Sequence, residues 1–234
     1  FNLIAKQVSK VKNRSDNIKD KKKGSEDPNK LNQNNVVQNP PQKAVDQLMN
    51  YYNQGKISKV FEEAQLLIKK YPEAYFVWNI LGVSAAQLGM LDKAIEAYKK
   101  SIYFNSDYAE AYCNMGTAFK DQGNLEQAIT SYNKAIALKS DYAEAYSNMG
   151  VALQYQEKYV EAMKAYHKCI LLNPHYVEAY INMGVTLHHQ RKHDNATEAY
   201  KMALSLNPNN ALVYNNMGNV FKDQDKLEEA IEAY

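Results

Sequence analysis

The 234-residue sequence contains few of the residues on which several classes of protein depend. Its two cysteines, Cys113 and Cys169, are too few for a disulfide framework. Nine glycines and six prolines leave little turn chemistry for a fold of many strands. No apolar run approaches the roughly 20 residues that a membrane-spanning helix needs. We therefore expect a helical, cytoplasmic protein that neither carries disulfides nor binds a membrane.

The net charge of +2 is unevenly distributed along the chain. Residues 1–40 hold 9 basic and 4 acidic side chains, whereas residues 41–234 hold 19 and 22. The body of the protein is thus slightly acidic, which argues against a nucleic-acid partner. Residues 1–40 are rich in Lys and Asn and poor in apolar side chains, so the sequence predicts a disordered leader there. Because the chain begins with Phe1 and ends inside a helical pattern at Tyr234, we expect it to be a piece of a longer protein.

A single fixed period governs the chain after the leader. Three positions keep one residue type in five successive copies. They are Gly82, Gly116, Gly150, Gly184 and Gly218; Ala94, Ala128, Ala162, Ala196 and Ala230; and Tyr98, Tyr132, Tyr166, Tyr200 and Tyr234. A constant period of about 34 residues indicates a repeat array.

Each copy has the pattern of two helices joined by a short turn. Tyr146, Met149, Gly150 and Leu153 recur at the spacing of one helical face, and a second apolar run follows over residues 159–170. The small residues at the Gly150 and Ala162 positions are expected where the two helix axes approach closely.

These residues resemble the tetratricopeptide repeat family: Tyr-x-x-Met-Gly-x-x-Phe/Leu, then Ala-x-x-x-Tyr, then Pro. The resemblance covers residues 75–234, with four full units starting at 75, 109, 143 and 177 and a truncated fifth from 211. Residues 41–74 resemble a degenerate capping unit, in which Leu48 replaces the glycine. The resemblance implies an all-α solenoid, a right-handed superhelix of helix-turn-helix units with a concave groove.

A catalytic or metal site is not apparent in the sequence. There is no glycine-rich phosphate loop and no serine in a G-x-S-x-G setting. His189 and His193 have the spacing of zinc ligands on one helical face, but the repeat places the turn between the two helices there. No third ligand follows at a suitable spacing, so we expect no metal and no cofactor. Cys169 falls where neighbouring units carry Ala, which predicts a packing role. Cys113 aligns with Ser147 and Ile181; the sequence leaves a reactive role open there, although it shows no nearby group that would activate the thiol.

Four asparagines also recur at this period, two positions before each glycine. They are Asn114, Asn148, Asn182 and Asn216. A side-chain amide offers a donor and an acceptor, so it can bind a peptide backbone without reading its side chains. One hypothesis is that these asparagines form a ladder that holds an extended polypeptide. The alternative, equally open from the sequence, is that they bond to a neighbouring helix or to water.

Charged residues accompany the asparagines in the same groove. Glu110, Glu144 and Glu178 recur near its edge, and Lys120 and Lys222 recur further along the first helices. Tetratricopeptide modules that clamp acidic chaperone tails carry basic residues where this chain has glutamates. That ligand is therefore disfavoured.

Two functions fit these observations. The first is a non-catalytic scaffold whose groove binds an extended protein segment. The second is the substrate-presenting arm of a larger enzyme, because the uninterrupted units resemble the arm of O-linked N-acetylglucosamine transferases. The leader and cap also resemble bacterial proteins that join such repeats to glycosyltransferase or sulfotransferase domains. Catalytic residues would then lie beyond Tyr234, so the sequence leaves open whether the protein is an enzyme. Self-association through Ile231 and Tyr234 of the last repeat is a further expectation.

Overall fold

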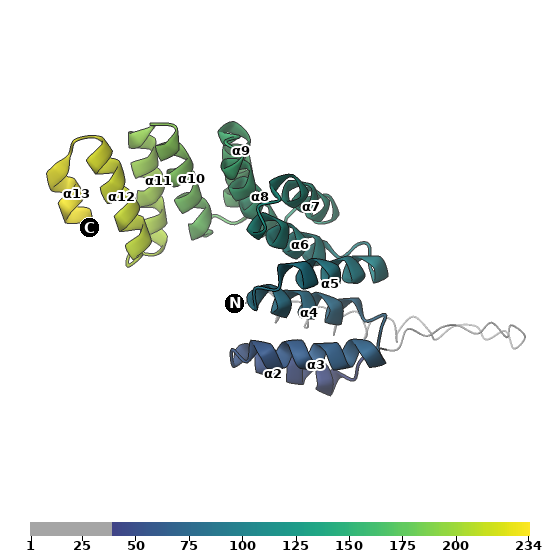
Figure 1. Ribbon diagram of the computed structural model, residues 1–234. Helices are drawn as coiled ribbons and strands as arrows, with labels where there is room; N and C mark the ends of the chain where they lie inside the picture. The colour runs from purple at the N-terminus through teal and green to yellow at the C-terminus, as the bar shows by residue number, and fades with distance from the viewer. Residues whose placement is uncertain (1–38) are drawn as a thin grey trace, which may run out of the picture. The chain divides into compact units, whose positions relative to one another are not determined.

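The computed structural model describes residues 39–234, and this part of the chain is all α-helical (Figure 1). The prediction for the leader falls almost wholly outside the described residues. The helices are α2 (Gln42–Asn53), α3 (Ile57–Lys70), α4 (Tyr75–Gln87), α5 (Leu91–Phe104), α6 (Ala109–Asp121), α7 (Leu125–Leu138), α8 (Ala143–Tyr155), α9 (Tyr159–Leu172), α10 (Val177–His189), α11 (His193–Leu206), α12 (Ala211–Asp223) and α13 (Leu227–Ala233). None of them is long and apolar enough to cross a membrane.

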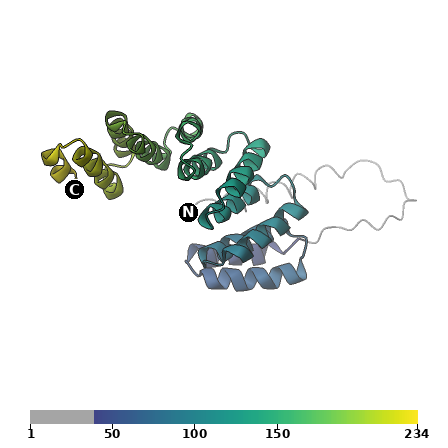
Figure 2. The same cartoon turned by 45° about the horizontal axis from the view of Figure 1, so that its top comes forward.

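The helices belong to two compact units that divide after Ser106. The N-terminal unit contains the described helices α2–α5, and the C-terminal unit contains α6–α13. Within each unit, successive helices pack as antiparallel pairs, which are visible in a second orientation (Figure 2). In the C-terminal unit the first helix of each pair is α6, α8, α10 or α12, and the second is α7, α9, α11 or α13.

A glycine and a tyrosine hold each of five pairs together. Tyr166 of α9 is fully buried, and its ring lies directly against Gly150 of α8. A Cβ atom added to Gly150 would lie 2.4 Å from a carbon of that ring, closer than real Cβ contacts allow. The same contact recurs at the other four glycines of the repeat, where the nearest ring carbon is 2.3–2.7 Å from the added Cβ. The sequence-based prediction of close packing is confirmed, and the group that needs the space is the tyrosine ring.

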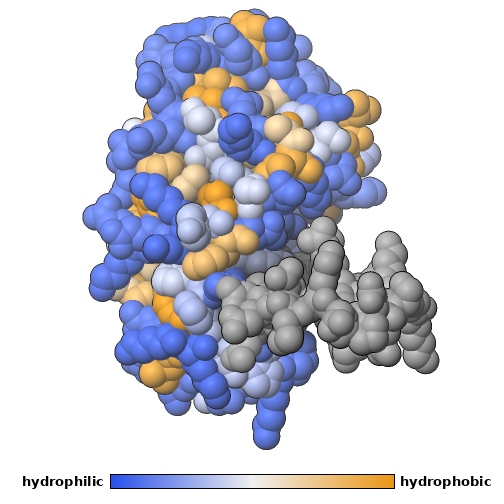
Figure 3. Space-filling view, turned by 90° about the vertical axis from the view of Figure 1, so that its right-hand side faces the viewer, coloured by the Kyte–Doolittle hydropathy of each residue, from blue (hydrophilic) through white to orange (hydrophobic). Residues whose placement is uncertain are grey.

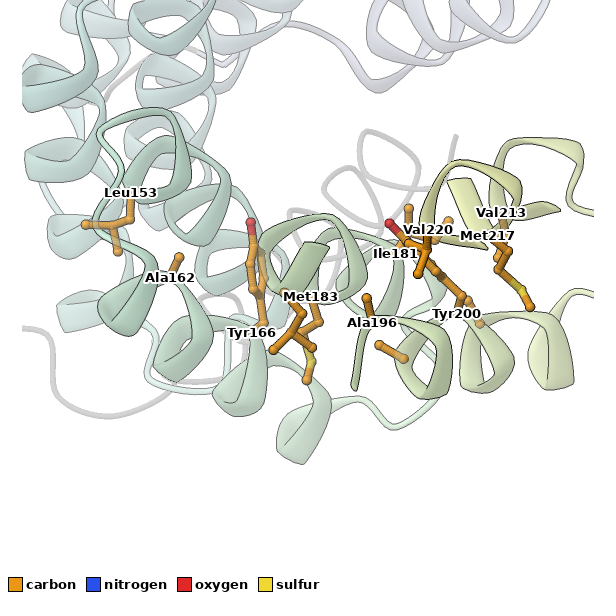
Figure 4. Close-up of a cluster of buried hydrophobic side chains, with 13 residues drawn as sticks. Leu153, Ala162, Tyr166, Ile181, Met183, Ala196, Tyr200, Val213, Met217 and Val220 are labelled. Carbon is orange, nitrogen blue, oxygen red and sulfur yellow. The ribbon is translucent and has the colours of Figure 1, made fainter. Parts of the chain in front are cut away.

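Small and apolar side chains fill the remaining core. In the C-terminal unit Ala162 and Ala196 are fully buried beside Tyr166 and Tyr200 (Figure 4). The N-terminal unit has its own core, which includes Leu48 at 1 % exposure. Each unit therefore contains buried apolar residues of its own, as expected of stacked helical repeats.

The turn inside each pair places one residue in the left-handed backbone conformation. Glycine occupies this position three times, at Gly55, Gly89 and Gly123, with φ between +70° and +80°. The next three pairs place Glu157, Arg191 and Asp225 there, at φ of 58–60°. Side chains with a Cβ adopt this conformation at a cost in free energy, so these three turns carry backbone strain.

The buried hydroxyl of Ser101 is expected to lower the free energy of unfolding slightly. Its side chain is fully buried in α5, its hydroxyl has no hydrogen-bond partner, and the repeat places Ala135 and Ala203 at the same position. We predict that Ser101→Ala raises the free energy of unfolding by about 1 kcal/mol, because it removes a desolvated and unpaired hydroxyl. Urea denaturation measures the change.

Ser84 provides the control for this substitution. It is equally buried, but its hydroxyl donates to the carbonyl of Leu81 at 2.9 Å. Ser84→Ala should give no comparable gain. A loss of stability in Ser101→Ala would show that its hydroxyl is satisfied.

Candidate peptide-binding surface

The first helices of the C-terminal unit bring the four asparagines to equivalent places. Each of the helices α6, α8 and α10 contacts the next first helix along the chain. Every asparagine is the sixth residue of its helix, and every one is half-buried. Each of these residues is therefore partly exposed to solvent. They are Asn114, Asn148, Asn182 and Asn216.

One of these asparagines also makes a contact between repeats. The Asn148 side-chain amide donates to the sulfur of Cys113 on the preceding first helix, with 4.0 Å between nitrogen and sulfur. Sulfur is a weak acceptor. The contact orients the Asn148 side-chain amide. It uses the amide nitrogen and does not involve the side-chain carbonyl oxygen.

The glutamates precede the asparagines by four positions, so the two side chains share a helical face. Glu110 and Glu144 are half-buried, whereas Glu178 is exposed. Burial raises the pKa of the Glu144 carboxyl above its usual value, and the Glu110 carboxylate adds to the rise while the Lys139 ammonium opposes it. Ionisation of Glu144 is therefore less favourable than that of a fully exposed glutamate.

The two lysines lie away from the asparagine stripe. Lys120 follows Asn114 by six positions, which rotates it by about 120° around the helix. Lys120 is half-buried, and its ammonium lies 3.0 Å from the Asp121 carboxylate. Lys222 is exposed. These lysines therefore border the surface on a different side from the asparagines.

Two contacts between repeats start from the same position of the repeat, which is Gln154 in α8 and His188 in α10. The sequence did not predict them. The Gln154 carbonyl oxygen accepts from the Tyr166 hydroxyl at 3.1 Å and from the Thr186 hydroxyl of α10 at 2.8 Å. His188 Nε2 lies 2.9 Å from the Asp223 carboxylate of α12, and this contact lowers the pKa of Asp223. The sequence carried only a weak indication of these contacts, because the residue type at the Gln154 and His188 position changes from copy to copy.

The histidine pair has the arrangement that the repeat predicts. Helix α10 ends at His189 and α11 begins at His193, so the turn separates them. The His189 ring stacks on Tyr159 with centroids 6.3 Å apart, and the His193 ring lies 5.6 Å from that of His188. Between residues 39 and 234, no three His, Cys, Asp or Glu side chains gather in a way that would hold a metal ion.

Both cysteines are free thiols in the core. Burial raises the pKa of Cys113 to about 12, with a further rise caused by the Glu144 carboxylate. Burial likewise raises the pKa of Cys169 to about 12. A thiol with such a pKa stays protonated at neutral pH and is a poor nucleophile. This agrees with the packing role predicted for Cys169 and argues against a reactive role for Cys113.

Comparison with protein-family models identifies the helix pairs. Two models described as tetratricopeptide repeats match residues 143–176, 177–210 and 199–232, and a model described as a TPR repeat matches residues 85–123 and 116–156. Together these matches span more than half of the chain. The protein belongs to the tetratricopeptide repeat family. No curated protein sequence matches it.

Solved tetratricopeptide structures share the fold. MamA is 29 % identical over 65 % of this chain and 90 % of its own, with a TM-score of 0.59. PilF of Pseudomonas aeruginosa is 18 % identical and covers 82 % of this chain and 87 % of its own, with a TM-score of 0.71. YrrB, described as a TPR protein with an unusual peptide-binding site, is 19 % identical over 73 % of this chain and 88 % of its own, with a TM-score of 0.57. The expected all-α solenoid is confirmed, whereas similarity to O-linked N-acetylglucosamine transferases is not shown by these comparisons.

Proposed function

We propose that this tetratricopeptide protein is an interaction scaffold whose C-terminal unit binds an extended polypeptide through Asn114, Asn148, Asn182 and Asn216. The observation that carries the proposal is the repetition of a partly exposed asparagine at one position of four neighbouring first helices. An amide can donate to a backbone carbonyl and accept from a backbone N–H. The description of YrrB as a peptide-binding tetratricopeptide protein supports the same use of the fold.

The spacing of the helices suits an extended ligand. Packed helices lie about 8–10 Å apart, and an extended chain advances about 3.3 Å per residue. One asparagine would therefore meet every third residue of the ligand. The carboxylates of Glu110, Glu144 and Glu178 flank this path and disfavour an acidic ligand.

Replacing all four asparagines with alanine is expected to abolish peptide binding. A peptide array probed with the full chain first supplies a ligand, and fluorescence anisotropy then measures its affinity for the variant. We expect a loss of about 100-fold or more, since each amide contributes a hydrogen bond worth about 1 kcal/mol. Circular dichroism and the melting temperature should stay unchanged, because none of the four side chains is fully buried.

A matched control replaces four exposed asparagines outside the ladder, namely Asn53, Asn133, Asn195 and Asn209. This variant should bind the peptide as the parent does. If the ladder variant also keeps its affinity, the asparagines do not hold the ligand and the proposal fails.

The presentation of substrate to a transferase domain remains a second candidate. It uses the same ladder, and it rests on the resemblance of the sequence to the arm of O-linked N-acetylglucosamine transferases and to bacterial repeat proteins joined to glycosyltransferase or sulfotransferase domains. Reading the coding sequence after residue 234 tests it. A nucleotide-sugar-binding α/β domain there would support this role, and a stop codon after a polar capping helix would exclude it.

Self-association of the 234-residue chain is the last part of the proposal. Helix α13 and the residue that follows it leave Leu227, Ile231 and Tyr234 exposed, at 61 %, 76 % and 61 %. Apolar groups gathered at one end of the chain favour contact with a second copy. Sedimentation equilibrium should show a mass that rises with concentration, and a constant monomer mass would remove this part of the proposal.

A further inference from the structure

A groove of about 750 Å³ crosses the N-terminal unit between α3 and α5, with α4 beneath it. Its volume falls within the roughly 300–1,000 Å³ typical of ligand pockets. It is separate from the asparagine ladder, because all its lining residues belong to α3, α4 and α5. On the face drawn in Figure 3, hydrophobic side chains form scattered patches among hydrophilic ones.

The floor of the groove is apolar and fixed in place. Phe61 and Ile68 come from α3, and Trp78 and Leu81 come from α4. The Trp78 indole N–H donates to the carbonyl of Pro72 at 2.7 Å. Because this donor is satisfied within the protein, Trp78 offers an incoming ligand an aromatic surface. Such a floor suits bulky apolar side chains.

The rim of the groove is basic. Helix α5 contributes Lys93, Lys99 and Lys100, against one carboxylate from Glu96. All three lysines are exposed, and among residues 39–234 none of them forms an ion pair. The Lys93 ammonium lies 6.0 Å from the centre of the Phe61 ring. Positive charge is thus held beside the apolar floor without an anionic partner from the described part of the chain.

One edge of the groove also carries an exposed aromatic ring. Tyr103 is 79 % exposed, and the Lys100 ammonium lies 5.9 Å from its ring centre. A ring so open contributes little to the stability of the unit. Its removal therefore tests binding without disturbing the fold.

The same positions in the later repeats lack this combination. The repeat places Gln127, Glu161 and Asn195 where α5 has Lys93, and Ala137, Leu171 and Ser205 where it has Tyr103. The groove is therefore a local feature of the N-terminal unit. General packing of the repeat does not account for it.

We propose that this groove binds an acidic segment of a partner protein, with bulky apolar side chains on the floor and carboxylates beside Lys93, Lys99 and Lys100. Complementary charge selects this partner. The chain's own residues 1–40 are a disfavoured occupant, because their 9 basic and 4 acidic side chains have the same sign of charge as the rim.

The test is a peptide array probed with the full chain. Half of the peptides carry Trp, Phe or Leu pairs flanked by Asp and Glu, and the other half carry the same apolar residues flanked by Lys. We expect binding to the acidic half, with affinities at least about tenfold higher than for the matched basic peptides. Equal binding to both halves, or none to the acidic half, would overturn the proposal.

Variants of the chain locate the site. Lys99→Glu with Lys100→Glu, and separately Tyr103→Ser, should each weaken the best acidic peptide by about tenfold. The matched control is Lys134→Glu with Lys168→Glu, which changes exposed lysines at the Lys100 position of α7 and α9. If this control weakens binding equally, attraction is not localised to the groove and the proposal fails.

Two further experiments distinguish the proposed partner segment from the other possibilities, which are binding of the chain's own leader in the groove and binding of the acidic peptide on the asparagine ladder. A synthetic peptide of residues 1–38 that displaces the acidic peptide would assign the groove to the chain itself. The four-asparagine variant should bind the acidic peptide normally. Loss of binding in that variant would place the peptide on the ladder instead.

Discussion

Replacing Gly150 with alanine is expected to destabilise the C-terminal unit by about 1–3 kcal/mol. The added methyl group would lie 2.4, 2.8 and 2.9 Å from three carbons of the Tyr166 ring. This ring is fully buried, so it cannot move aside into solvent. Alanine favours a helix over glycine by about 1 kcal/mol, and the clash must exceed that gain. Urea denaturation followed by circular dichroism measures the net change.

Two variants separate the clash from other effects. Gly150→Ala combined with Tyr166→Leu should recover part of the lost stability, because the smaller side chain makes room for the methyl group. Asn133→Ala, an exposed change on α7, reports helix propensity alone and should be neutral or slightly stabilising. If Gly150→Ala is as stable as the parent, the tyrosine ring has space that the structure does not show.

Placing glycine at all three strained turns is expected to raise the free energy of unfolding by about 2 kcal/mol. Glu157, Arg191 and Asp225 adopt φ of 58–60°, whereas the equivalent turns at Gly55, Gly89 and Gly123 already use glycine. The gain in free energy at each site is the strain energy that is relieved, minus the entropic cost of ordering glycine, which is more flexible in the unfolded chain. Asp225→Gly should gain least, because aspartate tolerates this conformation better than most residues. Urea midpoints of the single and triple variants measure the effect.

A matched triple variant changes the preceding residue of each turn. Gln156, Gln190 and Gln224 have φ of −86°, −80° and −98°, where glycine has no advantage. Their replacement by glycine should lower stability. If both triple variants become more stable, backbone strain is not the cause.

The periodic part of the molecule was predictable from the sequence because the same residue pattern recurs in five copies. The glycine and the closing tyrosine keep the same separation in every copy, as Gly150 and Tyr166 do. This constant separation was a signal for the contact of Gly150 with Tyr166. The asparagine ladder was found by the same means, and its role in binding stays a prediction.

Features that occur once could not be predicted in this way. The Gln154–Thr186 contact lies at the boundary of α8 with α10, and the His188–Asp223 contact lies at the boundary of α10 with α12; the two contacts use different residue types. The groove over Trp78 depends on Lys93 and Tyr103, which have no counterparts in the later copies. Such sites arise from side chains on separate helices, and only a three-dimensional arrangement brings them together.

The contact between the glycine and the tyrosine has a consequence for how the protein can change in length. Both residues belong to the same helix pair, so a copied or deleted pair carries its own contact with it. A gain or loss of one whole repeat from the C-terminal unit would leave the glycine–tyrosine contact of every remaining pair intact and would change the proposed ladder by one asparagine. An insertion between the glycine and the tyrosine of one pair would instead separate them. If the proposed ladder binds a peptide, gene duplication would change the length of peptide that it holds, in steps of about three ligand residues.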